Sequence, residues 1–100
     1  MKVLLMEKNL MLLSRIKNSL SDYEVIVGGK HTDEELVFIN VEVFPVDIIK
    51  ELKSKGAKVV AYCGHKNIDL QSKARKAGAD MVVPNSQVID AKAIIEKLGG

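Results

Sequence analysis

The chain has 100 residues and a mass of 11.0 kDa, which leaves room for one domain, and we place it over residues 1–100. Its net charge of +2 is too small to indicate a nucleic-acid partner, and no apolar run approaches the ~20 residues that span a bilayer. A single Cys excludes an internal disulfide, and a strand expected directly after Met1 leaves no room for an export signal, so we expect a cytoplasmic protein.

Five short apolar runs predict five strands of a sheet. They are Val3–Met6, Val25–Val27, Leu36–Ile39, Lys58–Tyr62 and Met81–Val83. Segments with helical spacing follow most of them, which is typical of a parallel sheet that is covered on both faces. The residues just past each run should then share one edge of the sheet, where the sites of such folds lie.

The first helix is expected over roughly Leu10 to Leu20, because Asn9 can cap it and apolar residues follow at helical spacing. The predicted core-facing stripe is Leu10, Leu13, Ile16, Lys17 and Leu20. Met11 and Leu12 lie off this stripe. The next run, Val25–Val27, is expected to be a short buried strand.

The connection from the second strand to the third is unusually short. The connecting segment, Gly28–Glu34, has only seven residues, whereas a parallel crossover normally takes a dozen or more residues and a helix. Fully extended, this segment reaches ~23 Å, just enough to return along a ~17 Å strand and step across two strand spacings. We therefore expect an extended strap with at most one helical turn.

The second half of the chain predicts three further helices and a turn. Pro45 suits the first turn of a helix that Gly56 ends, and Asn67 caps a helix over Ile68–Ala77. A turn is expected over Pro84–Gln87. The inward residues of the three helices are predicted to be Ile48, Ile49 and Leu52, then Leu70 and Ala74, then Ile89, Ala93, Ile94 and Leu98.

Four segments carry a resemblance that extends over essentially the whole chain. They are Lys2–Asn9, Glu35–Val41, Val59–His65 and Ala77–Val83, the last of which contains the sequence AGAD. In this order they resemble the receiver domain of two-component response regulators. The resemblance implies a flavodoxin-like three-layer sandwich with a five-stranded parallel sheet of order 2-1-3-4-5, whose second helix is missing or reduced to the strap.

The residues that match the phosphorylation site of receivers lack its chemistry. By this resemblance, Glu7 keeps one metal-binding carboxylate and Lys8 replaces the other, Asn40 stands at the phospho-accepting Asp, Cys63 at the switch Thr or Ser, and Asn85 at the invariant Lys. An ammonium group repels Mg²⁺, and a neutral amide is not the nucleophile of an acyl phosphate. We expect a degenerate switch site without metal or cofactor, and a protein that is not an enzyme.

Lys8 is expected to fill the position of the metal and to pair with Glu7 or Glu42. Glu42 could also be read as a displaced phosphate acceptor, but strand alternation turns its side chain differently.

Cys63 allows further interpretations. With His65 and His31 it could hold zinc, or it could sense redox state. A structural zinc site usually has four ligands at characteristic spacing, so we favour ordinary packing at the end of a strand.

The missing helix predicts an uncovered face on the first two strands. Val25, Val27, Val3 or Leu5 would be left partly open, and each exposed aliphatic side chain forfeits ~1.5–3 kcal/mol of burial. A shifted third helix, the strap with Phe38 or Phe44, or another protein chain could cover this face. The expected partner-binding residues are Met11, Leu12, Val25 and Val27.

Three functions follow from these observations. The first is a stand-alone, phosphorylation-independent module that binds a protein partner or a second copy of itself. The second is a flavodoxin-like small-ligand-binding protein or enzyme with a site at the C-terminal strand edges. The third is a nucleic-acid accessory protein that uses Lys66, Lys73, Arg75 and Lys76, although solvated basic residues on a helix are the more ordinary interpretation.

Overall fold

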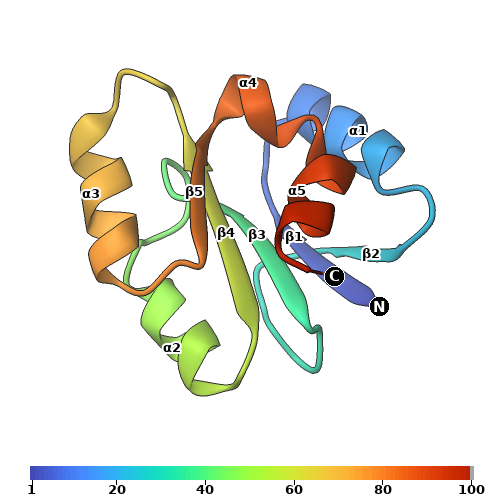
Figure 1. The fold of residues 1–100 in the computed structure, drawn as a ribbon, viewed down its shortest axis with the longest axis horizontal. Coiled ribbons are helices and arrows are strands. Elements are labelled where there is room, and N and C mark those ends of the chain that lie inside the picture. Colours follow the sequence, from blue (N-terminus) through green and yellow to red (C-terminus); the bar gives the residue numbers. More distant parts are fainter. Residues whose placement is uncertain (100) are drawn as a thin grey trace.

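The computed structural model describes residues 1–99 and contains a five-stranded parallel sheet of order β2-β1-β3-β4-β5. The strands are β1 (Lys2–Met6), β2 (Glu24–Val27), β3 (Leu36–Asn40), β4 (Lys58–Cys63) and β5 (Met81–Pro84). The helices are α1 (Leu10–Ser19), α2 (Ile48–Ser54), α3 (Ile68–Lys76), α4 (Asn85–Val88) and α5 (Ala91–Lys97). Figure 1 shows α2 and α3 on one side of the sheet and α1 and α5 on the other. The predicted fold class is confirmed.

Alternating side chains of the central strands divide the core into two clusters. Val3 and Leu5 of β1 are fully buried in the cluster that also contains Ile16 of α1 and Ile94 of α5. Leu4 and its alternating neighbours face the second cluster, under α2 and α3. The expectation that Val3 or Leu5 would be partly open is therefore wrong, because both side chains point toward α1 and α5.

The first helix and the second strand depart from the predicted burial. Ile16 and Leu20 are fully buried as expected, but Leu10, 81% exposed, and Lys17, also exposed, do not face the core as predicted. The strand β2 is not buried as predicted. It lies at the edge of the sheet, and Ile26 and Val27 are 36% and 43% exposed.

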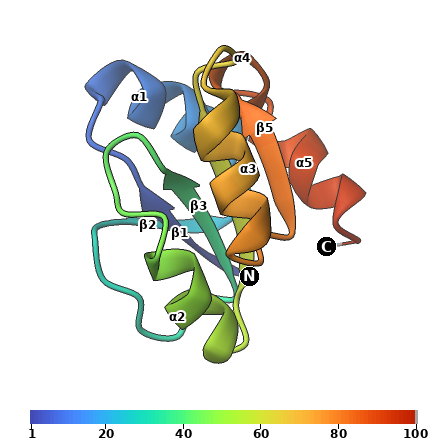
Figure 2. The ribbon, with the colours of Figure 1, turned by 90° about the vertical axis from the view of Figure 1, so that its left-hand side faces the viewer.

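The strap, residues 28–35, connects β2 to β3 without a helical turn, as Figure 2 shows. Phe44, from the loop after β3, packs against the second core cluster. Its ring also reaches the strap, so close to Gly29 that a Cβ at this residue would touch the ring at 3.4 Å. Phe44 thus adds to the cluster that contains the fully buried Leu4, on the face that has no second helix. Phe38 belongs to the opposite cluster.

The C-terminal segment contains one more helical turn than expected. The strand β5 continues through Pro84, and α4 replaces the predicted turn over Pro84–Gln87 because the fully buried Val88 side chain anchors it in the first core cluster. The last helix begins at Ala91, so Ile89 lies outside it. Among the helices of residues 1–99, none has the length and apolar character needed to cross a bilayer.

Candidate functional site at the carboxyl edge of the sheet

The five predicted switch residues lie along the carboxyl edge of the sheet. Glu7 and Lys8 directly follow β1, Asn40 ends β3, Cys63 ends β4, and Asn85 follows β5. Because all strands are parallel, these positions meet at the same edge.

The carboxylate of Glu7 is surrounded by protein donors. Its Oε2 accepts the backbone N–H groups of Lys8 at 2.8 Å and Asn9 at 3.0 Å. Its Oε1 accepts the Asn40 amide at 2.8 Å and the Tyr62 hydroxyl at 3.1 Å. Two carboxylate oxygens offer about four lone-pair positions, so these four bonds satisfy the group while it is only 4% exposed.

Asn40 is held in one orientation by its two bonds. Its Nδ2 donates to Glu7, and its Oδ1 accepts the backbone N–H of Glu42 at 2.9 Å. Mg²⁺ requires free, hard oxygen ligands, but here a neutral amide turns its nitrogen toward the carboxylate. The residues at this edge therefore do not fit the metal that the resemblance implies, and Asn40 offers no carboxylate nucleophile.

Lys8 does not replace a metal ion. The ion pairs formed within residues 1–99 are Lys2–Asp33, Lys53–Asp80 and Lys92–Asp22, so the expected pairing of Lys8 with Glu7 or Glu42 is wrong. Its ammonium lies 5.2 Å from the centre of the Phe44 ring instead, within the range of a cation–π contact. The backbone N–H of Lys8, not its side chain, donates a hydrogen bond to the Glu7 carboxylate.

Glu42 connects the loops that follow β3 and β4. Its carboxylate accepts the Gly64 N–H at 3.1 Å and the Asn67 side-chain amide at 3.3 Å. The Glu42 carboxylate therefore stabilises the loop after β4.

Cys63 is fully buried, and its thiol lies 3.8 Å from the carbonyl oxygen of Asn67. Burial, and secondarily the charge of Glu42, raise the pKa of the Cys63 thiol, so the reactive thiolate is disfavoured. His65 is exposed near this edge, whereas His31 lies in the strap. Within residues 1–99, no group of three or more His, Cys, Asp or Glu side chains is arranged to hold a metal ion.

Tyr62 is the member of the site that sequence reasoning missed. Burial, together with the adjacent Glu7 carboxylate, raises the pKa of its hydroxyl well above the usual range. A tyrosine in a fully buried strand needs a hydrogen-bond partner for its hydroxyl, and this requirement was the available signal.

Exposed apolar side chains surround the same edge. Leu10 and Met11 begin α1, Val27 ends β2, Val43 follows β3, and Ile68 begins α3. Their exposed fractions are 81%, 69%, 43%, 43% and 71%. We call these five residues the apolar rim.

The predicted partner-binding residues differ in their exposure. Met11 and Val27 are exposed, whereas Leu12 is half-buried, and Val25 packs against the first core cluster. A groove of about 470 Å³ between α1 and the end of β2 is lined by Leu10, Leu13, Ser14, Lys17, Asn18 and Val27.

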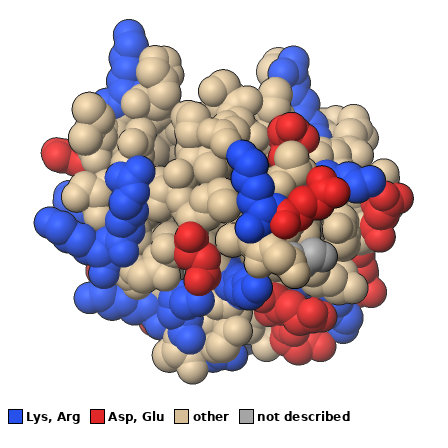
Figure 3. Space-filling model, viewed as in Figure 1, with Lys and Arg blue, Asp and Glu red and all other residues tan. Residues whose placement is uncertain are grey.

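Basic side chains gather on another surface. Figure 3 shows Lys and Arg concentrated on the side of α2 and α3. The predicted basic residues of that region, Lys66, Lys73, Arg75 and Lys76, are all exposed. The aromatic side chains that usually accompany a nucleic-acid footprint do not occur in α3.

The fold is similar to that of known receiver domains and response regulators. A response regulator from Thermotoga maritima superposes with a TM-score of 0.81 at 18% identity, covering 97% of this chain and 95% of that one. An orphan response regulator of H. pylori has a TM-score of 0.79 at 21% identity, with coverage of 97% and 94%. A LuxR-family DNA-binding response regulator from Staphylococcus aureus has a TM-score of 0.82 at 16% identity, with coverage of 99% and 98%.

No protein-family profile and no curated protein sequence matches the chain. At these identities the structural similarity shows the fold alone.

Proposed function

We propose that this chain is a regulatory signalling module that binds a protein partner and does not accept phosphate. The observation that carries the proposal is the Glu7 network: at the edge where receivers bind metal and phosphate, the carboxylate is saturated by protein donors. The similarity to response regulators supports a signalling role. A module without phosphotransfer chemistry passes its signal through surface contacts.

The apolar rim is the surface that supports protein binding. Leu10 and Met11 are adjacent in the first turn of α1 and largely exposed, and an exposed cluster of this kind is typical of an interaction site. Val27 extends the apolar surface along the groove beside α1. In this proposal Met11 and Val27 contact the partner directly, while Leu12 and Val25 support them from below.

The charges around α1 indicate what kind of partner fits. Residues 8–20 contain Lys8, Arg15 and Lys17 and no acidic residue. Complementary charges favour association and suppress incorrect partners. The expected partner therefore presents an apolar contact with acidic residues at its margin, and a second copy of this chain is the alternative.

The first test asks whether phosphate is accepted. Wild-type protein incubated with acetyl phosphate and Mg²⁺ should show no stable mass gain in intact-protein mass spectrometry. A mass gain that maps to the carboxyl edge would overturn the proposal.

The second test asks whether the apolar rim binds protein. Affinity capture from the native lysate should retain the same partner with and without acetyl phosphate, and the double variant Leu10→Ser, Met11→Ser should lose it. Both side chains are exposed, so the double variant should remain folded. Lys97→Ser, exposed at the far end of α5, is the matched control and should bind as wild type does. Retention of the partner by the Leu10/Met11 variant would contradict the rim assignment, and light scattering would show whether that partner is a second copy.

A further inference from the structure

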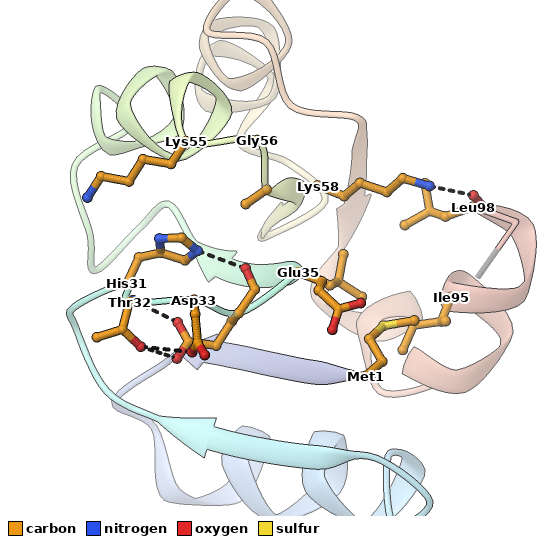
Figure 4. A pocket seen from close by; sticks show the side chains of 13 residues that line it. Met1, His31, Thr32, Asp33, Glu35, Lys55, Gly56, Lys58, Ile95 and Leu98 are labelled. Carbon is orange, nitrogen blue, oxygen red and sulfur yellow. Dashed lines mark hydrogen bonds between the residues drawn. The ribbon is translucent and has the colours of Figure 1, made fainter.

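A cavity of about 570 Å³ lies at the amino-terminal edge of the sheet, away from the Glu7 network (Figure 4). The strap forms one wall, the turn between α2 and β4 forms another, and α5 closes one end. This volume falls within the ~300–1,000 Å³ that is typical of sites for small molecules. It is larger than the groove of about 470 Å³ beside α1.

Apolar side chains form the inner surface of the cavity. Leu36 at the start of β3, Ala57 before β4 and Ile95 of α5 are at most 3% exposed and belong to the two core clusters. Leu98 and Met1 extend this surface toward the opening. Met1 is 44% exposed and Leu98 is half-buried, so a ligand with an apolar body can cover these two side chains above a floor that the core holds in place.

The two long walls carry opposite charges. The turn contributes Lys55 and the first residue of β4 is Lys58, with no acidic residue on this wall, whereas the strap contributes Asp33, Glu34 and Glu35 to the lining. Figure 4 shows the two lysines above Glu35, with the ammonium groups of Lys55 and Lys58 at opposite ends of the cavity. None of the ion pairs within residues 1–99 joins these walls.

Several of these groups already have partners within the protein. Asp33 pairs with Lys2 at 3.1 Å, and the Glu34 carboxylate accepts the backbone N–H and the hydroxyl of Thr32. Glu35 and Lys55, in contrast, have no side-chain hydrogen bond among the bonds of residues 1–99. Lys58 donates to the carbonyl oxygen of Leu98 at 3.2 Å and keeps its positive charge without a carboxylate.

His31 adds an unsatisfied acceptor to the strap wall. Its Nε2 lies 2.8 Å from the carbonyl oxygen of Glu34, and because a carbonyl can only accept, Nε2 carries the proton. Nδ1 then keeps a lone pair, and it is buried without a partner among the described residues.

From these observations we infer that the cavity binds a small zwitterion with an apolar body, such as a short apolar peptide. Its carboxylate faces the lysine wall, its ammonium faces Glu35, and its apolar side chains cover Leu98 and Met1. An ion of one sign alone would meet a like charge on one wall, whereas a zwitterion satisfies both. This site is independent of the protein-binding rim at the other edge.

The test is a titration of ¹⁵N-labelled protein with the dipeptide leucyl-leucine, followed by backbone amide shifts. Saturable shifts are expected to concentrate in residues 31–36, 55–58 and 94–98. Three analogues report on the three parts of the site: the N-acetylated dipeptide lacks the ammonium, the C-terminal amide lacks the carboxylate, and diglycine lacks the apolar body. Each of the first two should bind about fivefold more weakly, as the loss of one partly exposed ion pair predicts, and diglycine should give no saturable shifts.

Variants assign each charge to its wall. Glu35→Gln should weaken the binding of the dipeptide about fivefold and leave the affinity for the N-acetylated form unchanged. Lys55→Gln and Lys58→Gln should weaken the binding of the dipeptide and leave the affinity for its C-terminal amide unchanged. Lys50→Gln, exposed on α2 outside the cavity, is the matched control and should bind as wild type does. The inference is overturned if the dipeptide gives no saturable shifts, if all three analogues bind equally well, or if Glu35→Gln binds the dipeptide as tightly as wild type.

Discussion

The side-chain amide of Asn40 donates to Oε1 of Glu7 over 2.8 Å, and the two residues are only 5% and 4% exposed. A carboxylate that is removed from water requires compensation, and here neutral donors provide it. The amide, the Tyr62 hydroxyl and two backbone N–H groups together hold one negative charge in a buried position. The Glu7 carboxylate therefore has no free position left for a metal ion.

Asn40→Asp should destabilise the protein by about 3 kcal/mol at neutral pH, because it removes a donor and places a second carboxylate against Glu7. Urea unfolding at neutral pH measures this loss. Asn18→Asp on the exposed face of α1 is the control and should change stability by less than about 0.5 kcal/mol.

The double variant Lys8→Asp, Asn40→Asp should bind Mg²⁺, because three carboxylates would then meet at the end of β1 and β3. Calorimetry should show binding to the double variant and none to wild type. Lys8→Asp alone is the control, since the Asn40 amide still donates to the Glu7 carboxylate in that protein. No heat of binding in the double variant would show that the edge lacks the geometry of a receiver.

The sequence is sufficient to predict the sheet, because strand-end residues and apolar runs are local signals. The strand order and the strap follow from the resemblance and from the length of residues 28–34, and both are found in the structure. Burial in β2 was less predictable, because an edge strand and a central strand have the same apolar pattern until the neighbours are known. Val3 and Leu5 show the same limit, since alternation does not say which face the helices cover.

The site was predictable in its positions and not in its contacts. Glu7 and Asn40 were placed at the correct edge, but side-chain direction decides which groups meet. Lys8 points to the Phe44 ring, while Tyr62 reaches Glu7 from β4, a strand 55 residues later in the chain. Contacts of this kind depend on tertiary packing, which residue types alone do not specify.

Tyr62→Phe should cost about 1.5–3 kcal/mol at neutral pH, because the Glu7 carboxylate loses a donor while the core keeps its volume. Burial and the charge of Glu7 raise the pKa of Tyr62 above the value of about 10 in an unfolded chain. The folded state thus holds this proton more tightly, and its contribution to stability is lost as the pH rises above about 10. Wild type should lose more stability than Tyr62→Phe between about pH 9 and about pH 11 in urea unfolding; equal losses would contradict the buried hydroxyl.

The Cys63 thiol should react slowly with an aromatic disulfide reagent in the folded protein, because it is buried and its pKa is raised, chiefly by burial. The rate should rise with the unfolded fraction when urea is added. Reaction of the folded protein as fast as the unfolded chain would instead support redox sensing.

Asp80→Asn should cost about 1–2 kcal/mol at neutral pH, because the carboxylate joins three segments of the chain. It accepts the Lys53 ammonium at 2.8 Å and the Val59 N–H at 2.7 Å, and both side chains of the ion pair are about one-third exposed. Partial burial acts to raise the pKa of Asp80, but these donors outweigh it and hold the pKa below its usual value. A depressed pKa stabilises the fold above the unfolded pKa of about 3.9 and loses that contribution as the pH falls.

The stability difference between wild type and Asp80→Asn should therefore narrow when urea unfolding is repeated at about pH 3. Asp22→Asn is the matched control, because its bridge to Lys92 joins side chains that are 70% and 51% exposed, and exposed pairs contribute little. Its effect should stay below about 0.5 kcal/mol. If the two variants lose the same stability, the AGAD carboxylate does not hold α2 and β4 together as its contacts indicate.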